Sequence, residues 1–413
     1  MWIELLKDFF QDLKAHRTRA MLTLIAITWG TVSVVLLLAF GEGLGNQMLN
    51  GLMNAGDRIM IVYGGETGLV FEGLPKGRRV RLTEDDVQML QTAIPDFVMA
   101  SPQYRNTVTL THEKFQITTE CEGVNAEFEE MRRMYPVLGG RFLTNIDVLQ
   151  RRRVIFLGEI IATEIFGDED PIGKMLGVDG IPFTVVGLMQ KKIQTSSNNG
   201  PDTRRAIIPY TSFRTMYGNQ YVNSMVLRPN DRAKQLWLKS EIYRVLGKKY
   251  RFDPADERAL GIWDFIEGEK ISRKIAFGMS IFLGSVGFLT LLIAGVGVAN
   301  VMYVVVKERT REIGIKMAIG ARRIYILSQF IFEALLISFI GGTIGILISW
   351  SVISLIRLLP ADDGAMQFLG RPILSSGVML LTTGILAAIG FVAGFFPARR
   401  AASVDPVESL RYE

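Results

Sequence analysis

Four long runs without a charged residue stand out in the sequence, and they decide what kind of fold the chain can adopt. Each exceeds the roughly 20 apolar residues that a helix needs to cross a bilayer. The runs are Ala20 to Phe40, Ile275 to Val306, Ala334 to Ile356 and Pro372 to Ala398. We therefore predict an α-helical integral membrane protein with four transmembrane helices, at 20–40, 275–306, 324–356 and 372–398. The first run is too long for a cleaved leader and no small-x-small site follows it, so we expect it to stay in the protein.

Basic residues predict how these helices are oriented. Lys and Arg are about twice as dense in 1–19, 307–323 and 399–413 as in the remaining segments outside the runs. Both termini are therefore expected in the cytoplasm of a bacterium, with 41–274 forming a large periplasmic domain and 357–371 a short periplasmic loop. The net charge of +5 then reflects cytoplasmic loops of an inner-membrane protein, and we expect no binding to nucleic acid.

Two kinds of helix are expected beside the spans. In 1–19, apolar residues recur at helical spacing between charges, which is typical of a helix lying in the cytoplasmic membrane interface. The second uncharged run would be about 48 Å long at 1.5 Å per residue, against a hydrocarbon core of about 30 Å. We therefore expect helical stalks, at 41–56 and 258–274, that carry the first two spans into the outer domain.

The pattern between the stalks predicts a mixed α/β domain in two parts. The flanks, about 57–104 and 221–257, resemble two βαβ halves, with a strand at 58–62, a helix that begins after Thr83, a strand at 224–227 and a helix around 237–246. The middle, about 105–220, is expected to be an inserted, mainly β subdomain. Its expected strands are 108–110, 115–118, 154–157, 183–188 and 206–208, and we expect a mobile loop at 194–205.

Composition argues against several kinds of chemistry. Cys121 is the single cysteine and the chain has two histidines, so a zinc or haem centre is not expected. The segment from Gly167 to Met175 resembles a phosphate-binding loop, but it has five residues between its glycines and no hydroxyl after the lysine. No catalytic constellation stands out. We expect a non-catalytic chain that binds no cofactor.

The segment 307–323 carries the most specific functional prediction. It predicts a short amphipathic helix with charged residues on one face. The simpler alternative is a turn exposed to water, but a solvated turn would not explain so many isoleucines. A helix that docks into a groove on a partner explains both features. We predict polar contacts from Glu308, Arg309 and Glu312 and apolar anchors from Ile313, Met317 and Ile319. Gly314 and Gly320 complete the predicted coupling site.

Residues inside the spans suggest packing more than chemistry. Small residues spaced four apart allow close approach of membrane helices. The glycines predicted to serve this packing are Gly30, Gly284, Gly295, Gly341 and Gly345. Glu333, at the boundary of the third span, is expected to have a structural role, with a proton relay as the alternative.

Taken together, these segments resemble the MacB/FtsX family of ABC-transporter permeases. The segment KERTREIGIKMAIGARR, at 307–323, is similar to the family's signature between its second and third spans. The tail from Phe396 to Leu410 resembles its "PAxxAAxxDPxxAL" ending. Further matches, in the family's order, are Gly41-Glu42-Gly43, the turn at 138–142 and the segment 166–173. The resemblance covers nearly the whole chain.

The resemblance implies an architecture and a set of partners. It implies a homodimer over a cytosolic ABC ATPase dimer that holds the ATP and Mg, with a porter-like subdomain (57–104 and 221–257) and an inserted β-rich sabre-like subdomain (105–220). It also implies mechanotransmission, in which ATP-driven closure of the ATPase moves the stalks. Since 19 residues precede the first span, we expect the ATPase to be a separate polypeptide.

Three functions fit such a permease. The first is export of drugs, peptides or other molecules from the periplasm, with or without a periplasmic adaptor and an outer-membrane channel. The second is FtsX-like mechanical regulation of a periplasmic hydrolase or sensor. The third is LolCDE-like lipoprotein release. The substantial two-part outer domain favours the first function. The sequence leaves open the substrate and whether the partner permease is a second copy or a paralogue.

Overall fold

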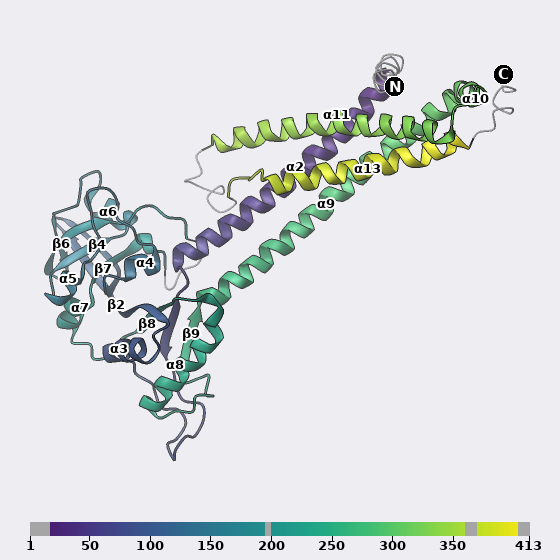
Figure 1. Cartoon of the computed structure of the whole chain (residues 1–413). Coiled ribbons are helices and arrows are strands. Elements are labelled where there is room, and N and C mark those ends of the chain that lie inside the picture. Colours follow the sequence, from purple (N-terminus) through teal and green to yellow (C-terminus); the bar gives the residue numbers. More distant parts are fainter. Residues whose placement is uncertain (1–16, 195–199, 360–369, 404–413) are drawn as a thin grey trace. The chain divides into compact units, whose positions relative to one another are not determined.

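The computed structural model describes residues 17–194, 200–359 and 370–403, and the chain divides into two compact units (Figure 1). One unit takes residues 48–273. The other combines the segments on either side of it, up to residue 47 and from residue 274. The inserted domain was predicted at 41–274, and the corresponding compact unit is 48–273.

Within the described residues, four helices are long and apolar enough to cross a membrane, as predicted. They are α2 (Arg17–Ala55), α9 (Phe265–Glu308), α11 (Arg323–Arg357) and α13 (Ser376–Ala402). The shortest has 27 residues, or about 40 Å at 1.5 Å per residue, which exceeds a hydrocarbon core of about 30 Å. A short helix, α10 (Thr310–Ala318), stands between α9 and α11.

The domain formed by residues 48–273 contains a split βαβ arrangement. Its elements are β1 (Met60–Gly64), α3 (Glu84–Ala93), β2 (Phe97–His112), β8 (Ser224–Pro229), α8 (Gln235–Tyr250) and β9 (Leu260–Asp264). The strands are ordered β2-β8-β1-β9 with antiparallel neighbours, so β1 and β2 run the same way around α3, as do β8 and β9 around α8. Two βαβ units are therefore present, although the closing strand of the second, β9, lies where the sequence predicted a stalk.

The middle of the domain is a closed ring of six strands. It contains the second half of β2 together with β3 (Phe115–Val124), β4 (Val154–Leu157), β5 (Met175–Val178), β6 (Ile181–Leu188) and β7 (Arg205–Pro209). The order β3-β7-β4-β6-β5-β2 closes because β2 also pairs with β3. Short helices connect the strands, namely α4 (Phe128–Arg132), α5 (Asn145–Leu149), α6 (Glu159–Phe166) and α7 (Tyr210–Tyr217). The predicted β-rich insertion is therefore present.

The long strand β2 belongs to both the βαβ part of the sheet and the six-stranded ring. The first part of β2 pairs with β8 as far as Gln103, and its pairing with β3 begins at the next residue, Tyr104. One apolar core is shared by the βαβ part and the ring, and it includes the buried Leu90 of α3 and Phe183 of β6. Cys121 lies in this core, and burial raises the pKa of its thiol, so it is an inert apolar group.

A buried ion cluster ties the ring to the end of α2. Arg132 lies 2.6 Å from Asp202, and Lys192 reaches the other oxygen of that carboxylate at 2.7 Å. Lys192 Nζ also donates to the carbonyl of Asn54, 2.9 Å away, and the Asn54 amide donates to the carbonyl of Ile193 at 2.8 Å. Burial lowers the pKa of Lys192 to about 8, against the opposing effect of Asp202. Thus the last turn of α2 is anchored to the segment that leads into the ring strand β7.

Several predicted boundaries inside the domain were wrong. The strand expected at 58–62 is β1 at Met60–Gly64, because Arg58 has a left-handed φ of 56° that ends any regular strand there. The stalk expected from 258 begins only at Phe265, since Leu260–Asp264 forms β9 by pairing with β1. The loop expected at 194–205 lies partly outside the described residues, and its end holds the short 3₁₀ helix Asp202–Arg204, anchored by the buried Asp202 carboxylate.

The boundaries around the spans also shift. Residues 1–16 of the predicted interfacial helix lie outside the described residues, and Arg17 to Arg19 already belong to α2. The last span begins at Ser376, where the Ser375 hydroxyl accepts a hydrogen bond from the amide of Val378, and it continues to Ala402. Most of the predicted loop 357–371 and the end of the predicted tail 399–413 lie outside the described residues.

Candidate functional site

The predicted coupling segment folds into a short helix between two turns. The helix α10 is shorter than the predicted 307–323, because α9 runs on to Glu308 and α11 starts at Arg323. Arg309 separates α9 from α10, and its carbonyl accepts a hydrogen bond from the amide of Ile313 at 3.0 Å. After α10, Gly320 has a φ of +103°, a conformation that favours glycine and turns the chain toward α11.

Two ion pairs hold this junction. Arg19 of α2 lies 3.1 Å from the carboxylate of Glu308 at the end of α9. Arg309 lies 3.2 Å from the carboxylate of Glu333 in α11, which also accepts a hydrogen bond from Gln329 at 3.3 Å. The junction is thus tied to α2 and to α11 by charges. The structural role expected for Glu333 agrees with this contact.

One face of α10 is buried in the core of its own unit. Ile313 is only 3% exposed, Gly314 is buried and Met317 is half-buried. The core around Ile313 consists of apolar residues from α9, α11 and α13, including Val306, Ile326, Phe330, Ala398 and Ala401. Ile313 and Met317 therefore hold α10 against the spanning helices.

The opposite face of α10 is open and carries both apolar and charged side chains. Ile319, just after the helix, is 82% exposed, and Ile315 is 41% exposed. Glu312 and Lys316 are exposed beside them. We call Glu312, Ile315, Lys316 and Ile319 the α10 surface. An exposed pair of isoleucines between opposite charges suits docking into a groove of a partner better than contact with water alone.

The predicted coupling residues fall into two groups, those with contacts inside the chain and those that are exposed. Glu308 and Arg309 are in ion pairs within the chain, and Ile313, Gly314 and Met317 pack inward. Glu312, Ile319 and Gly320 are exposed. Ile315 was missing from the predicted site, and the amphipathic period of α10 could have placed it on the open face.

The predicted packing glycines lie at contacts between helices of one chain. A Cβ on Gly345 of α11 would lie 2.6 Å from the Cβ of Thr31 in α2, and one on Gly341 would lie 2.9 Å from Ile27 of α2. The remaining three sit between other pairs: Gly30 and Gly284 between α2 and α9, and Gly295 against Ile389 of α13. Glycine at these positions lets the helix backbones approach closely.

No metal chemistry is evident in the part of the chain that the structure describes. Within it, no group of three or more His, Cys, Asp or Glu side chains could hold a metal ion. The turn from Gly167 to Lys174 is an exposed connection after α6, closed by an ion pair between Lys174 and Glu169. The contacts at the α9–α11 junction hold these helices together and leave the α10 surface exposed.

The fold and this junction define a class of protein: a membrane protein with four spanning helices, a large α/β domain inserted after the first, and a short amphipathic helix between the second and third. Comparison with family models agrees with this order. The model described as "MacB-like periplasmic core domain" matches residues 20–242, and that described as "FtsX-like permease C-terminal" matches residues 284–406. The chain belongs to the MacB/FtsX family of ABC-transporter permeases. It is an inner-membrane protein whose residues 48–273 form a periplasmic domain.

Relatives cover the whole chain at moderate identity. "Macrolide export ATP-binding/permease protein MacB" of Bdellovibrio bacteriovorus is 30% identical over 414 residues, which are 100% of this chain and 62% of the relative. The protein of the same description from Wolinella succinogenes is 29% identical over 99% of this chain and 61% of its own length. The chain thus spans about three fifths of the length of these relatives.

Solved structures of periplasmic regions are similar to part of the chain. The periplasmic region of MacB from Actinobacillus actinomycetemcomitans covers 55% of this chain and 97% of its own, at 18% identity and a TM-score of 0.43. The extracellular domain of the transporter YknZ from Gram-positive bacteria covers 50% of this chain and 100% of its own, at 15% identity and a TM-score of 0.42.

Proposed function

We propose that this chain is the non-catalytic permease subunit of a MacB-like ABC transporter, and that it couples ATP hydrolysis by a partner ATPase to movement of its periplasmic domain. One observation carries the proposal. Helix α9 is unbroken over 44 residues, from Phe265, directly after the domain strand β9, to Glu308, one residue before α10. A displacement of α10 could therefore be passed to the periplasmic sheet along one continuous helix.

The partner ATPase would contact the α10 surface. Ile315 and Ile319 offer apolar side chains for a groove, and Glu312 and Lys316 offer charges at its rim. The inward-facing Ile313 and Met317 then make α10 a stiff lever, because they fix it to α9, α11 and α13. ATP and Mg belong in the ATPase, and this chain binds no cofactor in the proposed mechanism.

At the domain end, the start of α9 is firmly attached to the sheet. The Asp264 carboxylate, at the end of β9, accepts hydrogen bonds from the amides of Ile266 and Glu267 in the first turn of α9. At the other end, the Arg19–Glu308 pair joins α9 to α2. We therefore expect α2 and α9 to move together as stalks.

The remaining parts of the proposal follow the family. Both termini and α10 lie in the cytoplasm, and two copies of the chain work over an ATPase dimer within membrane lipid. The split βαβ half is the porter-like subdomain and the six-stranded ring the sabre-like subdomain. The description of the relatives as macrolide export proteins supports export of drugs, peptides or other molecules from the periplasm, with a periplasmic adaptor and an outer-membrane channel as candidate partners.

Mass spectrometry of proteins that co-purify with the full chain from mild-detergent membrane extracts tests this function. We expect an ABC ATPase together with an adaptor or outer-membrane channel. An ATPase with a periplasmic hydrolase would instead identify an FtsX-like regulator, and one with lipoproteins a LolCDE-like release system. Repeated absence of any ATPase, whether as a separate protein or as a fused domain, would contradict the proposal.

A further inference from the structure

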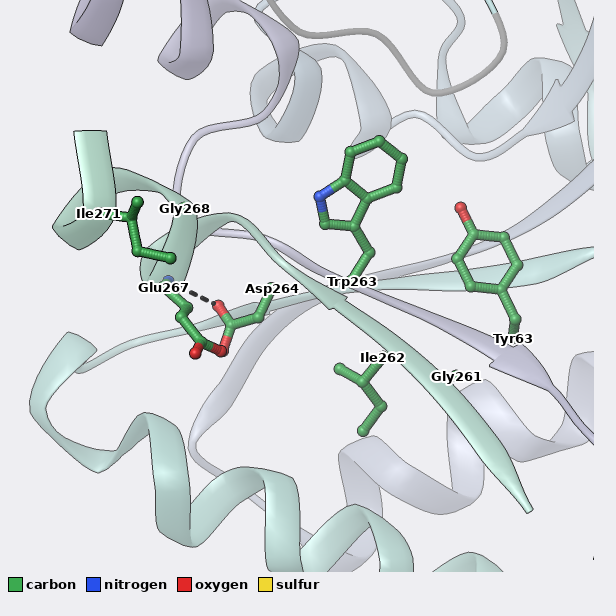
Figure 2. A pocket seen from close by; sticks show the side chains of 8 residues that line it. All are labelled: Tyr63, Gly261, Ile262, Trp263, Asp264, Glu267, Gly268 and Ile271. Carbon is green, nitrogen blue, oxygen red and sulfur yellow. Dashed lines mark hydrogen bonds between the residues drawn. The ribbon is translucent and has the colours of Figure 1, made fainter. Parts of the chain in front are cut away.

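An open hollow follows the free edge of the periplasmic sheet. β9 is the last strand in the sheet order, so only its side toward β1 is paired by a strand of the described chain. The hollow has a volume of about 540 Å³ and lies along β9 and the first turns of α9 (Figure 2). The hollow is shallow and largely open to solvent, so a ligand would lie along its surface.

Two aromatic rings flank a glycine in this hollow. Tyr63 of β1 pairs with Gly261 of β9, and Trp263 is two residues further along β9, on the same side of the sheet. Figure 2 shows both rings on that side of the strands. A Cβ added to Gly261 would meet only the Tyr63 side chain, at 3.8 Å or more, so the glycine is not required by packing. Its missing side chain leaves a slot beside the two rings.

The tryptophan is held in place but still accessible. Its ring stacks on that of the buried Phe265, with centroids 5.6 Å apart and an angle of 16° between the planes. The Trp263 side chain is nevertheless 40% exposed. A fixed, accessible indole is the best aromatic platform for a cation or for a flat apolar group.

The charge in the hollow is negative. Asp264 is already bonded to two backbone amides and to the Gln235 side chain. Glu267 is exposed, and no basic side chain of the described chain pairs with it. The nearest basic residues along α9 have other partners: Lys270 donates to Gln235 and Arg273 pairs with Glu269. The Glu267 carboxylate is therefore available to a ligand.

We propose that this hollow binds amphipathic organic cations, with the apolar body of the ligand against Trp263 and Tyr63 and its cationic group toward Glu267. Aromatic rings combined with a carboxylate select for such molecules over neutral or anionic ones. The inference rests on the proposed function, for which it names a substrate class. Because β9 continues directly into α9, a ligand bound here would lie at the start of the helix proposed to carry the motion.

Equilibrium dialysis of tetraphenylphosphonium against the full chain in nonionic detergent tests the site. Three variants probe it: Trp263→Ala removes the platform, Glu267→Gln removes the charge, and Gly261→Leu fills the slot without removing any group. The matched control is Trp237→Ala, which removes an exposed tryptophan of α8 outside the hollow. Tetraphenylborate, an anion of the same shape, tests the role of charge. Dialysis against the same detergent without protein measures uptake by the micelle, and this blank is subtracted from every reading.

We expect saturable binding of the cation to the wild type. Its affinity should fall about fivefold or more in Trp263→Ala and Gly261→Leu, and about threefold in Glu267→Gln. The affinity of the control Trp237→Ala should be unchanged. Tetraphenylborate should bind more weakly than the cation. Equal binding to the wild type, Trp263→Ala and Gly261→Leu would overturn the site, and equal binding of both ions would overturn the cation preference. Since no ATPase takes part, failure here leaves the coupling function standing, and failure of coupling leaves this binding intact.

Discussion

Arg309 Nη1 lies 3.2 Å from Oε1 of Glu333, and this contact joins the residue between α9 and α10 to the third turn of α11. The two side chains are only 16% and 8% exposed. A charge pair in such a place is costly to disrupt from one side, because the remaining charge stays buried. The pair therefore fixes where α10 stands against the spanning helices.

Glu333→Gln keeps the shape of the side chain but removes its charge. We expect the free energy of unfolding to fall by roughly 1–3 kcal/mol, because the largely buried ion pair between Arg309 and Glu333 is replaced by a weaker contact. Thermal unfolding of the full chain in detergent measures this, with the exposed Glu312→Gln as the control. An unchanged unfolding temperature together with lost transport activity would instead favour a proton relay.

The two faces of α10 should respond differently to an introduced charge. Ile319→Asp adds charge to an exposed position, so the chain should fold normally but lose stimulation of the ATPase. Ile313→Asp buries a charge in the core and should destabilise the chain by several kcal/mol. Unfolding temperature and ATP hydrolysis by the reconstituted complex separate the two effects. Full ATPase coupling in Ile319→Asp would remove that residue from the docking surface.

Two glycines of the spanning helices, one packed closely against another helix and one not, allow a controlled test of helix packing. Gly345→Ala should lower the stability by about 1–3 kcal/mol, since its Cβ would lie 2.6 Å from Thr31 and 3.0 Å from the backbone oxygen of Thr28. Gly297→Ala should cost nothing, because a Cβ there meets nothing within 4 Å. Thermal unfolding in detergent compares them, and equal losses would argue against close packing of α2 on α11.

The buried ion cluster of the periplasmic domain predicts a dependence on pH. Burial alone would raise the pKa of Asp202, but the charges of Arg132, Lys192 and Arg205 outweigh it and lower the pKa to about 2. The Asp202 carboxylate then binds a proton more readily in the unfolded chain than in the folded one. Its contribution to the free energy of unfolding is therefore fully present above about pH 4 and is lost as the pH falls toward 2.

Asp202→Asn should remove this contribution, roughly 2 kcal/mol, and flatten the loss of stability between pH 4 and 2. It should also lower stability at neutral pH, because Arg132 loses its charged partner. Urea unfolding of the full chain followed by circular dichroism at several pH values checks both effects, with the exposed Asp168→Asn as the control. Parallel pH profiles for the wild type and Asp202→Asn would contradict the assignment.

Sequence patterns predicted the elements whose causes are local. The helix after Thr83 begins where expected, since Asp86 accepts a hydrogen bond from the Thr83 amide at 2.7 Å. The four spans follow from runs of apolar residues alone. The strand β9 was missed, because it forms only by pairing with β1, some 200 residues earlier in the chain, and the helical spacing of its side chains suggested a stalk.

The coupling site was also predicted only in part, because some of its contacts are local in the sequence and others are not. The amphipathic pattern placed a helix at the junction, but the pattern could not say which apolar face packs inward. Burial of Ile313 depends on Phe330 and Ala398 from two other helices. Likewise, the partner of Arg309 is 24 residues away in the chain, and no local spacing signals such a contact.

The central claim, that α10 contacts an ATPase, can be tested directly by crosslinking. Cys121 is the only cysteine and is fully buried, so Ile319→Cys introduces the one accessible thiol among the described residues. A maleimide–benzophenone reagent on that thiol, photolysed in membranes, should capture an ABC ATPase domain. The same reagent on Trp237→Cys of the periplasmic domain should not. Capture of the ATPase from position 237 and not from 319 would contradict the account.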